Sequence, residues 1–472
     1  MTDVVLVVVD AARPDAVGHL DSPGDPTPTI DSLADRGISF PGAYACINTT
    51  DPSVTSIETG CYPATMGLYH HGGQVTRAEA AGLSALRTLP EVLSSAGYET
   101  GAVDWLGRWH QRGYDHYTGR EGYHDYDEGE GDTSPLKPVA DAVNARRDLL
   151  PGPIYEALKR AYRRFVNPVG DKDAVEDATE TTDRAISLFE GMDDPRYLFV
   201  HYWDVHAPYD TPEEYVESAC VPEFDVDESA LHASLSRIEN DDRRRYIEEI
   251  LADGLEPALR EYYGAMSYVD DELARLLEHV PDDAYVVVLA DHGESLFEHG
   301  IFFEHHGLYD VNTRVPLVIA GPDVPAAPTD GFVQLVDVMP TLLGRLDVES
   351  DAPVDGIDAF ERIEHGEPLR DAVFLEEAQT QRNRAIRTTE YTYIESLDEE
   401  PCSYCGVHHG EGEQLYDRRE DPGERENVAG DRPEMAADLR DRLRTFLAEG
   451  IGLPERRRVR ATLDRMVEEG SV

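Results

Sequence analysis

Three strongly apolar runs, far apart in the chain, each end in an aspartate. They are VVLVVVD ending at Asp10, RYLFVHYWD ending at Asp204 and AYVVVLAD ending at Asp291. Such runs, alternating with helical patterns, are typical of an α/β fold with a mainly parallel sheet and helices on both faces. Ligands of open α/β sheets bind at the carboxyl ends of the strands, so we expect the three carboxylates to converge on one sheet edge. A single aspartate in such a place is more often a helix cap.

The richest stretch is VVVLADHGESLFEHGIFFEHHGLYDVNTRVPLVIAGP, residues 286–322. Asp291 and His292 leave the apolar run together, as oxygen and nitrogen ligands of a divalent cation would. Further histidines lie close by in sequence: His299, His305 and His306 after Asp291, and His201 and His206 on either side of Asp204. The alternative interpretation of 286–322 is a histidine-rich surface loop.

A second stretch, NTTDPSVTSIETG at residues 48–60, resembles an anion-binding helix start. Pro52 is expected to open the helix, Asp51 to cap it and Gly60 to end it. Thr50 then lies just before the cap, with its hydroxyl near the positive end of the helix. A lone threonine there is usually a capping or turn residue.

The charge balance excludes several classes of partner. The 472 residues include 95 acidic and 42 basic residues, for a net charge of −53, and lysine occurs only at positions 137, 159 and 172. A basic surface for nucleic acid is absent, and anionic membranes would repel this chain. Acidic, lysine-poor surfaces along a whole chain suggest a protein that works in concentrated salt, where counterions screen self-repulsion.

No targeting or membrane segment is apparent in the sequence. The apolar run at the N-terminus is short, lacks a basic start and ends in Asp10, so we interpret it as a buried strand. No run approaches the ~20 apolar residues of a membrane span, and five cysteines do not suggest a disulfide framework. We therefore expect a cytoplasmic protein without membrane insertion; the sequence gives no indication of its oligomeric state.

An ordered set of motifs carries a family resemblance along nearly the whole chain. VVLVVVDAARPD is similar to the opening strand of the sulfatase family of the alkaline phosphatase superfamily, and TDPSVTSIETGCYPATMG to that family's nucleophile motif, C/S-x-P-S-R-x-x-L-x-T-G. The remaining matches follow in the family's order: TLPEVLSSAGYET, DVHAPY, ADHGE, RVPLVIAGP, VQLVDVMPTLL and EQLYDRREDPGERENVA. The resemblance implies a three-layer sandwich like those of alkaline phosphatase and the sulfatases, plus a smaller C-terminal α+β subdomain.

The resemblance also implies roles for particular residues. Counting back from Thr59 and Gly60 places Thr50 at the nucleophile position, whereas Cys46 is not followed by x-Pro-Ser and does not match. The implied metal ligands are Asp10, Thr50, Asp291 and His292. The implied catalytic residues are Thr50 as nucleophile, His206 as proton donor, His306 or His305 near the transferred anion, and Arg108 with His110 in GRWHQRG as oxyanion contacts. A structural arginine and histidine on a turn is the alternative for Arg108 and His110.

Three departures from the family pattern bear on the chemistry. Thr50 replaces the cysteine or serine that becomes formylglycine, Val54 replaces an arginine, and Ala11 replaces a second aspartate. The cofactor expected is one divalent cation, with calcium, magnesium or manganese favoured and zinc as an alternative. A second ion is conceivable, held by Asp204, His206 and His306.

The function expected is a metal-dependent hydrolase that cleaves a small anionic sulfuric or phosphoric ester through Thr50. The alternatives are a phosphodiesterase or phosphoalcohol transferase of the same superfamily, and a sulfatase-fold protein that binds an anion without turnover. Because threonine has no second hydroxyl to expel sulfate from the enzyme ester, we expect phosphate-ester turnover to match or exceed sulfate-ester turnover.

The domain organisation expected is a sulfatase-like catalytic domain over 1–365 and a C-terminal subdomain over 366–472. The catalytic domain carries acidic or helical insertions at 120–190 and 210–262. In PCSYCGVHHG (401–410), Cys402, Cys405, His408 and His409 could bind zinc. Their spacing makes a tetrahedral site from these four difficult, so we interpret 401–410 as a plain hairpin. The pattern of 431–450 predicts an amphipathic helix that packs on the small subdomain.

Overall fold

The computed structural model describes residues 1–20, 22–119, 177–224, 228–252, 254–324, 331–397, 400–410 and 412–450. Most of the predicted insertion at 120–190, up to residue 176, lies outside this described part, as do residues 451–472 of the predicted C-terminal subdomain.

A seven-stranded sheet forms the centre of the molecule, in the order β2-β8-β7-β1-β6-β4-β5. All neighbouring pairs are parallel except those that involve β8, which runs antiparallel to both β7 and β2. The strands are β1 (Val4–Val9), β2 (Gly37–Ser39), β4 (Glu99–Val103), β5 (His116–Thr118), β6 (Arg196–Tyr202), β7 (Tyr285–Leu289) and β8 (Leu317–Ala320).

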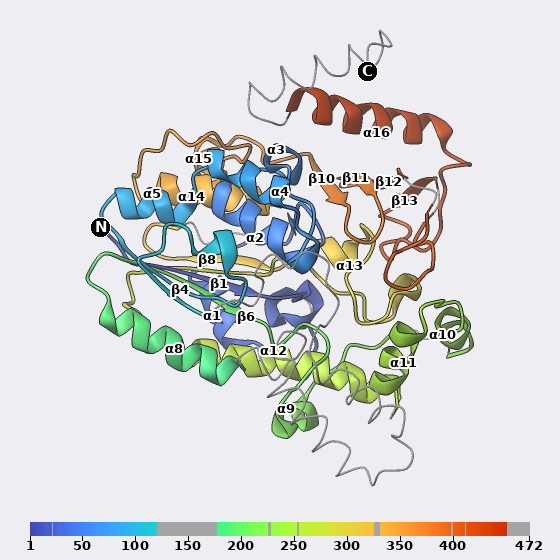
Figure 1. The fold of residues 1–472 in the computed structure, drawn as a ribbon, viewed down its shortest axis with the longest axis horizontal. Coiled ribbons are helices and arrows are strands. Elements are labelled where there is room, and N and C mark those ends of the chain that lie inside the picture. Colours follow the sequence, from blue (N-terminus) through green and yellow to red (C-terminus); the bar gives the residue numbers. More distant parts are fainter. Residues whose placement is uncertain are drawn as a thin grey trace.

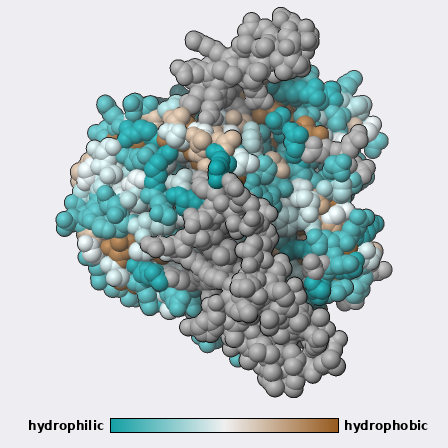
Figure 2. Space-filling view, in the orientation of Figure 1, coloured by the Kyte–Doolittle hydropathy of each residue, from teal (hydrophilic) through white to brown (hydrophobic). Residues whose placement is uncertain are grey.

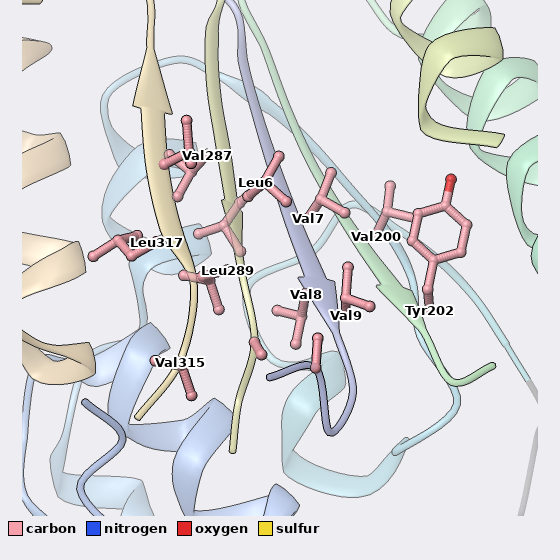
Figure 3. Packing of buried hydrophobic residues seen from close by; sticks show 14 of the residues in the cluster. Leu6, Val7, Val8, Val9, Val200, Tyr202, Val287, Leu289, Val315 and Leu317 are labelled. Atoms are coloured by element: carbon pink, nitrogen blue, oxygen red, sulfur yellow. The ribbon is translucent and has the colours of Figure 1, made fainter. Parts of the chain in front are cut away.

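The three apolar runs of the sequence are the three adjacent central strands β7, β1 and β6. All six residues of β1 are buried, because helices cover both faces of the sheet at its centre. Figure 3 shows Val7 and Val9 of β1 beside Val200 of β6, with Leu289 of β7 on the other side of β1. This explains why β1 is apolar at every position instead of alternating.

Helices pack on both faces of this sheet, and the three-layer α/β sandwich is confirmed (Figure 1). One layer contains α1 (Pro28–Asp35), α8 (Ala178–Gly191) and α12 (Leu255–Leu277). The other contains α2 (Thr50–Thr59), α5 (Leu89–Ser95) and α14 (Val338–Arg345). Shorter elements complete the domain: α3 (Pro63–Met66), α4 (Arg77–Gly82), α9 (Glu213–Ser218), α10 (Glu228–Leu235), α11 (Asp241–Ile250), α13 (Asp310–Thr313), α15 (Ala359–His365), and the paired strands β3 (Ala43–Tyr44) and β9 (Val333–Gln334).

A smaller antiparallel sheet forms the C-terminal part, in the order β10-β11-β12-β13. The strands are β10 (Ala372–Glu377), β11 (Asn383–Thr388), β12 (Tyr391–Ser396) and β13 (Glu413–Asp417), and α16 (Pro433–Thr445) packs on them (Figure 1). Leu439 and Leu443 of α16 are buried in one cluster with Ile386, Tyr393 and Leu415 of the sheet. The amphipathic helix predicted within 431–450 therefore packs on the small subdomain, as expected.

Parts of the two predicted insertions belong to helices that pack on the central sheet or on its covering layer. Residues 178–191 form α8, which packs on β4, β6 and α12, so this end of the predicted 120–190 insertion is a layer of the core fold. Residues 255–262 likewise begin the long core helix α12. The segment between them contributes α9, α10 and α11. Local sequence pattern did not separate these core helices from the inserted ones.

Hydrophilic residues cover most of the described surface on the face seen in Figure 2. Among the residues described, no helix combines the length and the apolar character needed to cross a bilayer.

Candidate active site

The carboxyl ends of β1 and β7 bring Asp10, Asp291 and His292 together. All three side chains are fully buried, and one potential ligand atom from each lies within 4.8 Å of the others. Nε2 of His292 is 3.3 Å from Oδ2 of Asp291 and 3.6 Å from Oδ1 of Asp10. Two parallel strands that are neighbours in the sheet necessarily end at the same edge, so residues 281 positions apart in the chain become neighbours.

Three of the four carboxylate oxygens of Asp10 and Asp291 lack a hydrogen-bond partner. Both carboxylate oxygens of Asp10 and Oδ2 of Asp291 have none, whereas Oδ1 of Asp291 accepts from the backbone N–H groups of Ala11 and His292. Burial, together with the negative charge of Asp10, raises the pKa of Asp291. Carboxylate oxygens and an imidazole nitrogen are ligand types that bind divalent cations. Buried carboxylate oxygens without a partner are also stabilised by a nearby positive charge, which a bound cation would provide.

Thr50, the first residue of helix α2, lies beside this cluster. Its Oγ1 is 3.1 Å from Nε2 of His292. Nδ1 of His292 is 3.0 Å from the carbonyl oxygen of Gly293, which can only accept, so Nδ1 carries the hydrogen and Nε2 faces the Thr50 oxygen as an acceptor. The Thr50 hydroxyl thus contacts one of the three residues that form the cluster of potential metal ligands.

Helix α2 differs in detail from the helix that the sequence predicts. It begins at Thr50, with Thr49 in the capping position, and ends as expected at Gly60, whose φ of 64° is left-handed. Asp51 does not cap the helix, which corrects the sequence interpretation. The Ser53 hydroxyl donates a hydrogen bond to the backbone carbonyl of Asp291 at 2.6 Å. This bond holds the start of the helix against the end of β7.

The carboxylate of Asp51 instead contacts three basic side chains. Arg108 donates to Asp51 Oδ2 at 2.5 Å, Nδ1 of His71 lies 2.9 Å from the same oxygen, and Nε2 of His110 lies 3.2 Å from Oδ1. Burial opposes ionisation of Asp51, but these partners hold its pKa well below the ordinary value. Arg108 and His110 therefore lie next to the nucleophile position, with their charge engaged by the residue that follows Thr50.

The sequence analysis did not select His201 and Asp104 as site residues. Nε2 of His201 lies 3.6 Å from Asp10 Oδ2, and Nδ1 lies 2.9 Å from Oδ1 of Asp104. Asp104 directly follows β4, so the same signal that marked Asp10 and Asp291 applies to it. The run before it, ETGAV, is too short and too weakly apolar to be recognised as a buried strand. For His201, the available signal was a histidine inside an otherwise apolar run.

Asp204, the third aspartate expected at the sheet edge, has a different role. Its Oδ1 accepts from the backbone N–H of Ala178 at the start of α8, at 3.0 Å, which is the helix-capping alternative. The second cation site considered for Asp204, His206 and His306 is not formed. Over the described ranges, the clusters suited to a metal are the one at Asp10 and another that contains His306.

A pocket of about 160 Å³ opens beside Thr50. Asn48, Thr49 and Thr50 form one side of it, His206, His305 and His306 another, and Gln379, Thr380 and Tyr404 of the C-terminal subdomain close it, together with His71, Trp203 and Glu304. None of these lining residues is an arginine or a lysine. Binding of an anion here therefore depends on imidazoles, backbone N–H groups and a cation.

His206 and His305 are the histidines next to the cluster. The His305 ring stacks on that of His292 with centroids 4.1 Å apart, and its Nδ1 faces the carbonyl oxygen of Asn48. The His206 ring stacks on Trp203, and its Nδ1 is 2.6 Å from the carbonyl oxygen of Ala207. In both rings Nδ1 therefore carries the hydrogen, which leaves Nε2 for proton exchange. Burial lowers the pKa of each ring.

The family follows from comparison with known proteins. Residues 2–348 match the family model described as Sulfatase. The chain belongs to the sulfatase family. Residues 297–449 also match the model for the C-terminal region of N-sulphoglucosamine sulphohydrolase. This family is part of the alkaline phosphatase superfamily, and the chain is accordingly an ester hydrolase by descent.

Relatives and structural neighbours are distant but match the sulfatase over its length. It is 24% identical over 475 residues to the uncharacterized sulfatase YidJ of Escherichia coli (strain K12), covering 94% of this chain and 86% of that protein. An ulvan-active sulfatase of Formosa agariphila is 23% identical over 471 residues, 95% of this chain and 81% of that protein. The phosphonate monoester hydrolase of Agrobacterium radiobacter superposes with a TM-score of 0.71 at 19% identity, covering 95% and 96% of the two chains.

The structure shows the surroundings of two residues that differ from the family pattern, Ala11 and Val54. Ala11, at the position of the second aspartate, has a left-handed φ of 59°, and its carbonyl oxygen accepts from the Tyr262 hydroxyl at 3.0 Å. A strained backbone thus directly follows Asp10 and is held in place by a tyrosine of α12. Val54, at the position of the arginine, is fully buried in the core.

Proposed function

We propose that this protein is a metal-dependent hydrolase of small anionic esters in which Thr50 is the nucleophile. The observation that carries the proposal is the contact of the Thr50 hydroxyl with Nε2 of His292, which itself lies beside the Asp10 and Asp291 carboxylates. A cation bound by these groups would lower the pKa of the Thr50 hydroxyl and neutralise charge on the transferred group. Magnesium, calcium or manganese suits the carboxylates and zinc suits the histidine, so the metal is a variable of the test.

The neighbouring residues have complementary roles in this proposal. With Nε2 of His292 held by the cation, the Thr50 hydroxyl would release its proton to solvent water, and Oγ1 would bond to phosphorus or sulfur as the bond to the leaving oxygen breaks. His206 is held in place by the Ala207 carbonyl. It donates a proton to the leaving oxygen and later takes a proton from the water that releases the product from Thr50. His305 contacts the transferred anion from the wall of the pocket. Arg108 and His110 act through Asp51, positioning the start of α2.

Cys46 is the competing nucleophile, and its surroundings argue against it. It is fully buried in the cluster beneath the C-terminal sheet, beside Gln334, and is absent from the pocket lining. Burial raises the pKa of its thiol far above the ordinary value, which keeps it protonated.

The ester expected to turn over fastest is a phosphate or phosphonate. Threonine has no second hydroxyl to expel a sulfate from the enzyme ester, so water would have to attack sulfur. A phosphoryl-threonine is resolved more readily when histidines orient that water. The relatives include sulfatases, whereas a neighbour in fold is a phosphonate monoester hydrolase, so descent does not decide the ester.

A parallel assay tests this function. Nitrophenyl sulfate, nitrophenyl phosphate, a methyl phosphate diester and a phenylphosphonate ester are offered in high salt with magnesium, manganese, calcium or zinc. Thr50→Ala should lower turnover by about three orders of magnitude or more, Thr50→Ser should restore part of it, and Cys46→Ala should leave it nearly unchanged.

The other outcomes separate the alternatives. Cleavage of sulfate alone, with Cys46→Ala as the inactivating change, would overturn the assignment of Thr50. Formation of a new ester with an added alcohol would identify a transferase. Anion binding without turnover of any ester under any metal would identify a binding protein.

A further inference from the structure

The connection between β12 and β13 carries a second group of buried metal-binding side chains. Residues 402–407 turn tightly, since the N–H of Cys402 donates to the carbonyl oxygen of Val407 at 3.0 Å and the N–H of Gly406 donates to that of Cys402 at 2.9 Å. Gly406 has a left-handed φ of 74°. This backbone brings the two thiols of a Cys-x-x-Cys motif to the same side.

Two histidines complete the group, and one of them comes from the catalytic domain. Nε2 of His409 lies 2.9 Å from Sγ of Cys405, and Nδ1 of His306 lies 3.5 Å from Sγ of Cys402. All four residues are buried, and one ligand atom from each lies within 4.8 Å of the others. Tetrahedral zinc, with Zn–S and Zn–N bonds of about 2.3 and 2.0 Å, needs ligand atoms about 3.3–3.8 Å apart, which small shifts of these groups satisfy.

We propose that Cys402, Cys405, His306 and His409 hold a structural zinc ion. Two thiolates and two imidazoles form a closed set that selects zinc over calcium or magnesium. The fourth ligand comes from residue 306, not from the adjacent His408. The spacing argument against a site within 401–410 therefore does not apply.

The surroundings of the ligands support this assignment independently. A zinc-binding histidine commonly directs its second ring nitrogen at a carboxylate. Nε2 of His306 lies 3.3 Å from Oε2 of Glu304, and Glu304 in turn pairs with Arg243 at 2.5 Å. The backbone N–H of His409 donates to Oε1 of Gln381 at 2.9 Å, which holds the other end of the connection.

The ion would clamp the C-terminal subdomain to one wall of the active-site pocket. His306 follows directly on His305, and the Tyr404 ring lies against the His306 ring with centroids 5.2 Å apart. Both Tyr404 and His306 line the pocket beside Thr50. In this arrangement His306 is a structural ligand, and the contact with the substrate anion falls to His305.

Metal analysis and cobalt substitution of the full chain test the proposal. Purified in high salt without chelator, wild type should retain one zinc ion per chain through dialysis. The cobalt-substituted protein should show the sulfur-to-cobalt charge-transfer band and the intense visible bands of a tetrahedral thiolate site. Cys405→Ser and His409→Ala should lose the charge-transfer band or reduce it severalfold. His408→Ala is the matched control and should keep it.

Two further measurements do not depend on the folding of the ligand variants. In wild type, zinc should protect Cys402 and Cys405 from iodoacetamide while the exposed Cys220 reacts, and a strong chelator should expose both. Asp291→Asn should keep the cobalt–thiolate spectrum, which separates this ion from the catalytic cation. An inactive enzyme with that spectrum would refute only the proposed function. A wild type without it, or with a Cys402–Cys405 disulfide, would overturn the zinc site.

Discussion

At the scale of single residues, His110 shows how a buried charge can depend on its neighbours. It lies beneath the nucleophile position, with Nε2 3.2 Å from Asp51 and Nδ1 3.5 Å from Glu58. Burial alone would lower the pKa of His110, but these two carboxylates outweigh burial and raise it from 6.5 to about 9. The ring is therefore expected to be protonated at neutral pH.

This shift predicts how stability changes with pH. Because the folded chain keeps a proton that the unfolded chain loses near pH 6.5, the stabilisation is complete below that pH and is lost as pH rises to about 9. The free energy of unfolding should fall by about 3 kcal/mol at most across this window. Denaturant titrations from pH 6 to 9.5 should show the slope in wild type and in the exposed His365→Gln, and a flatter profile in His110→Gln. Equal slopes in all three proteins would contradict the assignment.

At the scale of elements, a buried arginine joins the C-terminal sheet to the catalytic domain. Arg387 of β11 has no exposed surface, and its guanidinium donates to Glu424, to the Thr313 hydroxyl and to the carbonyl oxygen of Leu308. Glu424 is also buried and accepts from the backbone N–H of Asp310. The charged pair lies within the C-terminal subdomain, and its hydrogen bonds to Thr313, Leu308 and Asp310 attach it to the preceding part of the chain.

Removing one partner of this pair should be costly. Arg387→Met leaves the Glu424 carboxylate buried without its cation, and we expect a loss of about 3–5 kcal/mol in the free energy of unfolding. The double variant Arg387→Met/Glu424→Gln should recover part of that loss. Arg384→Met, on the same strand but partly exposed, is the matched control and should change stability by less than about 1 kcal/mol. Calorimetry in high salt measures all three; a harmless Arg387→Met would contradict the expectation.

At the scale of the whole molecule, the net charge of −53 governs the conditions under which the fold is stable. Like charges spread over one surface repel one another in the compact state more than in the expanded chain, and salt screens this repulsion. The melting temperature should therefore rise with potassium chloride from about 0.1 M upward, most steeply below about 1 M, where the screening length shortens to about 3 Å. Sucrose is the control, because it favours compact states without screening charge. A midpoint that is flat or falls with salt would refute this prediction.

The architecture and part of the candidate site could be predicted from the sequence. Hydrophobic runs and their order are local properties, and adjacent parallel strands must end at one edge, so the convergence of Asp10 and Asp291 could be predicted. The family motif placed Thr50 at the nucleophile position, one residue before the cap that the sequence predicted for the helix. Which polar groups meet across elements could not be predicted in this way. In the structure His201 lies beside Asp10, and Asp51 pairs with Arg108 instead of capping its helix. His306 meets Cys402, which is 96 residues away in the chain. The physical reason is that such contacts depend on how strands and subdomains dock, and no spacing along the chain records that docking.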